Sequence, residues 1–135
     1  MAMPEHTAKA FDVDLQELTR MVAEMGGLAE RQIADAVDAL ARRDADRAQR
    51  TVAGDPSIDA LCTSVFRELL TYMMEDARNI TYCIHLMFCA KNIERMGDHA
   101  TNIAETVYYM IEGHAIADQR PKGDTTSFAT LAAEK

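Results

Sequence analysis

The sequence contains no tryptophan and few glycines, prolines or aromatic residues. Six of its 135 residues are Gly, three are Pro, and 6% are aromatic. No alternating pattern typical of β-strands is visible, and the abundant residues are Ala, Leu, Met, Glu and Arg, which favour helices. With 48% hydrophobic residues, the chain also has too much apolar material for wholesale disorder. These features predict one all-helical domain.

Cysteines and long apolar runs are also scarce. The three cysteines, Cys62, Cys83 and Cys89, are odd in number and form no C-x-x-C pair, which argues against a disulfide framework or a zinc knuckle. We interpret them as buried thiols in a reducing compartment. Residues 1–10 contain no apolar signal-peptide core, and no apolar run approaches the length of about 18 residues that spans a bilayer. We therefore predict a cytoplasmic protein that contacts membranes only through a partner.

Positive charge is in deficit. The 14 Lys and Arg residues face 22 Asp and Glu residues, which gives a formal net charge of −8. A surface of this sign repels nucleic-acid phosphates, so we expect no DNA or RNA partner. It attracts divalent cations or a basic patch on another protein.

Three long segments carry apolar residues at steps of three or four, as amphipathic helices do. The first segment contains Phe11, Leu15, Leu18, Val22, Met25, Ala29, Ile33, Ala36 and Leu40. The second contains Ala48, Val52, Ile58, Leu61, Val65, Leu69, Tyr72 and Met73. The third contains Ile80, Ile84, Met87, Ala90, Ile93, Met96, Ala100, Ile103, Val107 and Ile111. They predict helices at about 7–43, 45–75 and 79–112.

The residues between these segments are of types common at helix ends. Asp44 can cap the second helix, and Gly113 is placed to end the third. Pro56 predicts a kink or restart near residues 54–56, with Asp55 as the new cap. Gly26-Gly27 lies inside the first helix, where we expect a neighbouring helix to approach closely.

Short loops between three amphipathic helices predict an all-α, up-down-up three-helix bundle over residues 1–113. Residues 114–135 lose the periodicity and contain Pro121 and Gly123. We therefore expect a flexible C-terminal tail.

The third helix carries a row of oxygen-bearing side chains. Relative to Glu94, Asp98 lies about 40° round the helix, Asn102 about 80° and Glu105 about 20°, so the four share one face. The apolar stripe occupies another sector, so we expect this face to point outward. Neighbouring carboxylates repel, and a divalent cation would turn the repulsion into attraction. Oxygen ligands suit Mg²⁺, Mn²⁺ or Fe.

From spacing alone, a solvated polar face explains these acids more simply than a metal site does. His99 is interpreted as a surface residue. A ferritin-like di-iron site needs Glu-x-x-His pairs, and Glu94, Glu24 and Glu30 have no histidine three residues on. Neither a nucleophile elbow nor a Gly-rich phosphate loop is present, so the residues predict no enzyme.

Residues 92–105, NIERMGDHATNIAE, closely resemble the signature of the PhoU family. The resemblance continues upstream in FRELLTYMMED (66–76) and RNIT (78–81), and at the start in HT (6–7), KAFD (9–12) and EMGGL (24–28). Together these stretches cover most of residues 6–112.

The resemblance implies a cytoplasmic, non-enzymatic negative regulator of phosphate uptake and of the phosphate-starvation response. Such proteins act between the phosphate ABC transporter and a sensor histidine kinase. Several bind metal, iron or zinc among them, through a Glu/Asp-x-x-x-Asp motif that here falls on Glu94 and Asp98. With Asn102 and Glu105 continuing the row, the expected cofactor is Fe, Zn, Mn or Mg, with no organic group.

One departure from the family pattern is large. Family members usually carry two tandem three-helix bundles, and this chain has room for one. Its opening resembles the start of the first repeat and its second half the end of the second, joined near residues 58–61. We expect the chain to form a homodimer that rebuilds a two-bundle body. The competing hypotheses are an interaction bundle without metal, a remnant with altered signalling, and, last, a metal-dependent enzyme.

Overall fold

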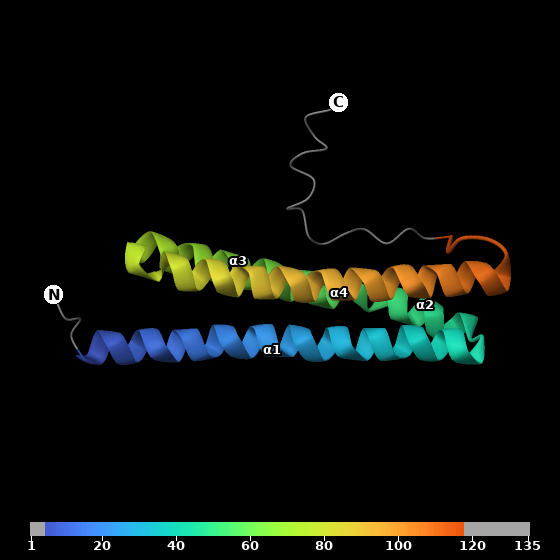
Figure 1. Cartoon of the computed structure of the whole chain (residues 1–135), viewed down its shortest axis with the longest axis horizontal. Coiled ribbons are helices and arrows are strands. Elements are labelled where there is room, and N and C mark those ends of the chain that lie inside the picture. The colour runs from blue at the N-terminus through green and yellow to red at the C-terminus, as the bar shows by residue number, and fades with distance from the viewer. Residues whose placement is uncertain (1–4, 118–135) are drawn as a thin grey trace, which may run out of the picture.

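The computed structural model describes residues 5–117, with side chains described from residue 12 onward. The elements are α1 (Glu5–Arg42), α2 (Ala45–Ala53), α3 (Asp55–Glu75), a short 3₁₀ turn η1 (Ala77–Asn79) and α4 (Ile80–Glu112). Figure 1 shows α1 and α4 as two long rods, with α2 and α3 following one another along the third. Within the described range there is no strand, so the predicted all-α three-rod bundle is confirmed.

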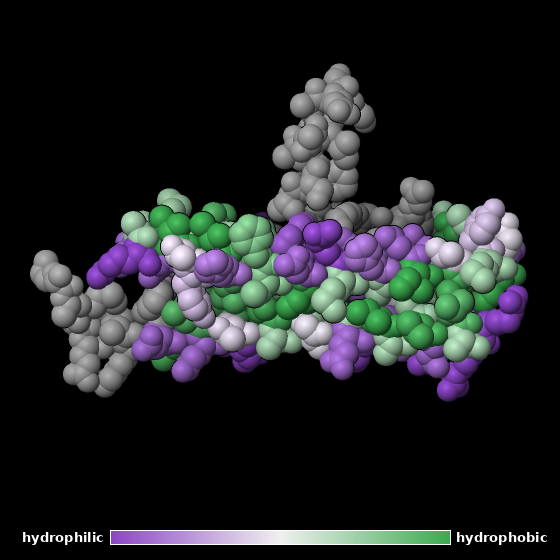
Figure 2. Space-filling model, in the orientation of Figure 1, coloured by the Kyte–Doolittle hydropathy of each residue, from purple (hydrophilic) through white to green (hydrophobic). Residues whose placement is uncertain are grey.

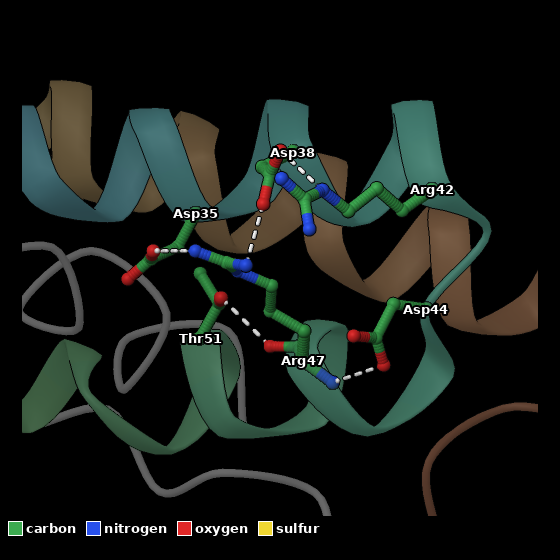
Figure 3. A network of polar contacts seen from close by, with 6 residues as sticks. All are labelled: Asp35, Asp38, Arg42, Asp44, Arg47 and Thr51. Atoms are coloured by element: carbon green, nitrogen blue, oxygen red, sulfur yellow. Dashed lines mark hydrogen bonds and ion pairs between the residues drawn. The ribbon is translucent and has the colours of Figure 1, made fainter.

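The joint between α1 and α2 is held by an αL residue and a network of charges. Arg43 has φ 52°, and the Asp44 side chain accepts a hydrogen bond from the Arg47 backbone N–H at 3.0 Å, which confirms the predicted cap. The Arg47 guanidinium reaches back to α1, where it pairs with Asp35 at 3.1 Å and with Asp38 (Figure 3). The hydrogen bond with Asp35 raises the pKa of Arg47. These contacts pin α2 against α1.

The predicted break near residues 54–56 falls at Gly54, between α2 and α3. Pro56 lies in the first turn of α3, where its missing N–H costs nothing. Asp55, however, was wrongly predicted as the cap: it is the first residue of α3, Gly54 is the N-cap position, and no side chain caps this helix. The Asp55 side chain is fully buried instead.

The core has two parts with different side-chain sizes. At the α3 end, large residues such as Leu18, Met25, Val65 and Leu69 fill it. At the α2 end it consists mainly of alanine, and its buried members are Ala36, Ala39, Ala48, Val52, Ala100, Ala104 and Val107. Small side chains let helix backbones approach closely. The bundle is therefore tightest where α1, α2 and α4 meet.

The predicted apolar stripe of α4 is only partly buried. Ala90, Ala100 and Val107 are in the core, but four large predicted members are exposed by 36–46%: Ile80, Ile84, Met96 and Ile103. The buried face of α4 consists instead of Cys83, Ala90, Glu94, Gly97, Ala100, Thr101, Ala104 and Val107. Side-chain size explains why the buried face differs from the predicted stripe. The space beside α1 and α3 accepts small side chains and excludes long ones.

Glycine placement also differs from expectation. A Cβ added at Gly26 or Gly27 would meet nothing within 4 Å, so the predicted close approach at these residues is wrong. The close approach occurs at Gly97 in α4, where an added Cβ would lie 2.9 Å from Ile58 Cδ1 and 3.1 Å from Gln32 Oε1. Gly97 thus makes room on α4 for the ends of the Ile58 and Gln32 side chains.

The remaining expectations concern the cysteines and the end of α4. Cys62 and Cys83 are buried as predicted, and burial raises the pKa of the Cys83 thiol, but Cys89 is exposed. Gly113 ends α4 with φ 79°, as its position predicted. Ile116 packs against the alanine-rich part of the core, and the rest of the predicted tail, residues 118–135, lies outside the described residues. No described helix combines the length and apolar content of a bilayer span.

Replacing Gly27 with alanine and replacing Gly97 with alanine should have opposite effects on stability. Gly27→Ala should raise the free energy of unfolding by about 0.5–1 kcal/mol, because alanine favours helix and nothing crowds it. Gly97→Ala gains the same propensity but overpacks the core at a cost of about 1–3 kcal/mol, so a net loss of about 1 kcal/mol is expected. Urea unfolding monitored by circular dichroism measures both; an equal rise in the two variants would contradict this packing.

Arg43 offers a second stability test. Its αL conformation is strained for a residue with a Cβ and free for glycine, so Arg43→Gly should stabilise the chain by about 0.5–1 kcal/mol. Arg43→Ala keeps the Cβ and is the matched control, with little change expected. Equal midpoints of thermal unfolding for the two variants would show that Arg43 carries no such strain.

Candidate functional site

Two buried aspartates begin the candidate site on α3. Asp55 and Asp59 are four residues apart, so they lie on one face of the helix, and their exposures are 0% and 1%. Fully buried carboxylates are rare unless they are paired or bind a metal. The helix starts at Gly54 without a side-chain cap, which leaves Asp55 to point into the bundle.

Asp98 on α4 completes a cluster with these two residues. One carboxylate oxygen from each of Asp55, Asp59 and Asp98 lies within 4.8 Å of the others. Asp98 is partly exposed, so the cluster reaches the surface on one side. Among the described residues this is the one group of three or more acidic, histidine or cysteine side chains close enough to share an ion.

Glu94 lies one helical turn before Asp98 and is fully buried. Its Oε2 forms an ion pair with Lys91 Nζ at 2.9 Å. The prediction that this face points outward is therefore wrong at Glu94. Helical spacing gives the angles between side chains correctly, but it does not give the orientation of the whole face, which follows from the small residues that turn inward on α4.

The other two predicted ligands lie apart from the cluster. Asn102 and Glu105 are both exposed, on the turns of α4 that follow Asp98. Of the four predicted site residues, the structure thus brings Asp98 into the acidic cluster and buries Glu94 one turn away.

Neutral polar groups surround the cluster. The Thr101 hydroxyl lies 3.1 Å from both Asp55 Oδ1 and the Gly97 carbonyl oxygen, so it can donate to either. Gln32 of α1 is nearly buried, and its Nε2 donates to the Thr51 carbonyl oxygen at 3.5 Å. Its Oε1 and Asp55 Oδ1 both face Gly97, at 3.1 and 3.7 Å from an added Cβ. All three rods therefore contribute to one polar pocket in an otherwise apolar interior.

The donor set fits a hard metal ion. Mg²⁺, Mn²⁺ and Ca²⁺ bind oxygens at about 2.0–2.6 Å, so two ligands of one ion lie at most about 5 Å apart. The oxygens of Asp55, Asp59 and Asp98 meet this limit. Placing several like charges in a low-dielectric interior is costly, and a divalent cation would offset the repulsion. Lys91, beside Glu94, supplies one positive charge to the same region.

Sequence reasoning missed Asp55 and Asp59, although a signal for them exists. Asp55-x-x-x-Asp59 repeats the spacing of Glu94-x-x-x-Asp98, on the neighbouring helix. Asp55 also fits the pattern of a cap before proline, and that local explanation hid its role in the interior. Two i,i+4 acid pairs on helices expected to pack together could have predicted the cluster.

Comparison with known proteins finds one family model and several named relatives. The family model of the PhoU domain matches residues 22–107, a stretch that contains the whole acidic cluster. A protein of Rhizobium meliloti is 54% identical over 112 residues, which cover 83% of this chain and 47% of that protein. A Caulobacter vibrioides protein is 45% identical over 84% of this chain and 49% of its own length. Both are named phosphate-specific transport system accessory protein PhoU homolog.

A more distant relative from Pseudomonas aeruginosa has the same name and is 40% identical over 68% of this chain. No solved structure matches. The chain spans about half the length of the Rhizobium and Caulobacter proteins. The family match extends over most of the bundle and agrees with the resemblance carried by residues 92–105, so the chain belongs to the PhoU family.

Proposed function

We propose that this chain is a PhoU-like regulator of phosphate homeostasis. In this role it restrains phosphate uptake and the phosphate-starvation two-component response, acting in the cytoplasm through protein contacts rather than catalysis. The main support is the family match over residues 22–107 together with the names of the relatives. The partners we propose are the phosphate ABC transporter and a sensor histidine kinase, as well as a second copy of the chain.

We further propose that Asp55, Asp59 and Asp98 hold a metal ion, with Glu94 beside them. This set replaces Asn102 and Glu105 of the sequence-based prediction, because those two side chains are exposed. Oxygen ligands suit Mg²⁺, Mn²⁺ or Fe, and Zn²⁺ is an alternative. A bound ion would supply positive charge that links the start of α3 to the middle of α4. The acids would hold this joint together, and Gly97 and Thr101 would keep the two helices in register.

A second function is an interaction bundle without metal. The ion pair between Lys91 and buried Glu94 favours it, because the protein itself brings positive charge to the acidic region. In this case the acids specify how the helices pack, and the exposed face of the bundle contacts the partner. Metal content separates the two possibilities.

The metal proposal predicts binding that depends on the aspartates. After chelation and dialysis, adding Mn²⁺ or Fe²⁺ at 100 times its dissociation constant should stabilise the wild-type chain by about 2.7 kcal/mol. Asp59→Asn and Asp98→Asn keep the side-chain shape but remove a charge, so each should weaken binding at least tenfold. Thermal unfolding and isothermal titration calorimetry measure both effects.

Glu105→Gln is the matched control for this experiment, since Glu105 is exposed on the same helix and outside the cluster. It should bind metal like the wild type. Unchanged metal affinity in Asp59→Asn would favour the interaction bundle without metal. So would a wild-type chain that is not stabilised by Mg²⁺, Mn²⁺, Fe²⁺ or Zn²⁺.

The regulatory proposal predicts a phenotype. Deleting the gene from a host with no second family copy should leave phosphate-starvation genes expressed in high phosphate, and the wild-type chain should restore repression. Transcript levels in high and low phosphate measure this. Normal repression in the deletion strain would contradict the proposed role, whatever the metal content of the purified protein.

A further inference from the structure

A row of exposed apolar side chains follows the outer side of α4 and drifts about 20° round the helix with every seven residues. Its members recur every seven residues: Tyr82, Cys89, Met96, Ile103 and Met110. All five are exposed, and the exposures of the four large ones run from 36% at Ile103 to 55% at Met110. A seven-residue repeat is the spacing at which one helix packs along another. We call these five residues the α4 seam.

The α4 seam borders a groove between α4 and α1. At one end, Tyr82 lines a hollow with Asp12, Leu15, Gln16 and Thr19 of α1. At the other end, Ile103 and Met110 line a hollow that includes Leu40 of α1, and Val37 nearby is 51% exposed. Figure 2 shows hydrophobic residues gathered along the middle of this face, most densely toward the α2 end. The seam thus runs between two hollows beside α1, of which the one at Tyr82 is partly polar and the one at Ile103 is mostly apolar.

The fold itself does not use this surface. The side of α4 that packs in the bundle carries Ala90, Gly97 and Ala104, and all three are buried. The large seam residues on the other side belong to neither core cluster and keep 36–55% of their surface exposed. Extended exposed apolar surface of this kind marks an interaction site.

Charge and size indicate which partner fits. The hollow at Ile103 is lined by no Asp, Glu, Lys or Arg; its lining residues are Leu40, His99, Asn102, Ile103, Thr106, Val107 and Met110. The neutrality of this hollow matters for a chain of net charge −8, because a copy of the same charge can approach it without direct repulsion. From residue 82 to 110 the seam runs about 42 Å, and across two helices about 20 Å wide it offers roughly 800 Å², the area that each partner of a stable complex buries.

The size of this surface and the neutral hollow at Ile103 together point to a second copy of the same chain as the partner. Deepening the self-association that the proposed function includes, the structure assigns the α4 seam and the α1/α4 groove as the surface on which a second copy of this chain docks. The contact is isologous, with the two α4 helices antiparallel and Met96, the midpoint of the seam, near the two-fold axis.

Sedimentation velocity of the full chain tests the assignment. At 50 μM (roughly a thousandfold above the Kd of a nanomolar-range dimer), the wild type should sediment at twice the 15.0 kDa chain mass. Ile103→Asp places a charge in the middle of the neutral face and should sediment at the mass of one chain, with an unchanged helical spectrum. Met74→Asp is the control: Met74 is 87% exposed on α3, outside the seam, and its variant should remain a dimer.

A disulfide tests the register. In a Cys89→Ser background, Met96→Cys should form a linked dimer on mild oxidation, because the two copies of residue 96 meet at the axis. Met74→Cys in the same background should stay unlinked. A monomeric wild type, or a dimer that persists in Ile103→Asp, would overturn the assignment. The metal titration repeated on Ile103→Asp separates this assignment from the proposed metal site. Because the acidic cluster lies on another side of α4, metal should stabilise this variant as much as the wild type.

Discussion

The close approach of α4 to the other two rods is the constraint on which the rest of the structure depends. A Cβ added at Gly97 would lie 2.9 Å from the end of the Ile58 side chain and 3.1 Å from that of Gln32, and Ala100 and Ala104 continue the same small face. Because this face must turn inward, every other side of α4 has a fixed direction. Glu94 is carried into the interior and Met96 and Ile103 are carried out of it. One packing requirement therefore determines both the acidic cluster and the apolar surface.

Buried acids impose the second constraint. Asp55, Asp59 and Glu94 are all removed from water, and Asp98 is partly so. Charges in such a place destabilise a fold unless other charges or hydrogen bonds offset them, and replacing them with apolar residues of similar size is often neutral or stabilising. Their concentration at one point, where α3 restarts after Gly54, is costly for a purely structural purpose. This cost is the physical reason to connect the cluster with ligand binding rather than with stability.

The sequence predicted the elements well and the orientation of α4 poorly. Helix ends at Asp44, Gly54 and Gly113 follow from local chemistry, which acts within a few residues and leaves clear signals. The inward face of α4 depends on which side chains fit between two other rods, and hydrophobicity alone favours Met96 and Ile103 over Gly97 and Ala104. The site prediction was incomplete for the same reason. It named Glu94 and Asp98, whereas the Asp55 and Asp59 side chains that lie beside Asp98 come from α3, through packing between helices distant in sequence.

The two surfaces of α4 are related by its geometry. Met96 is two residues from both Glu94 and Asp98, which places about 200° of helix rotation between it and Glu94. The acidic cluster therefore faces α3, while the α4 seam faces nearly the opposite way. A rigid helix cannot turn one face without turning the other. Any event that rotates α4 against α3, or prevents that rotation, therefore affects both the acidic cluster and the α4 seam. With the proposed ion site on one side of α4 and the proposed docking surface on the other, the helix would connect ion binding directly to association with a partner.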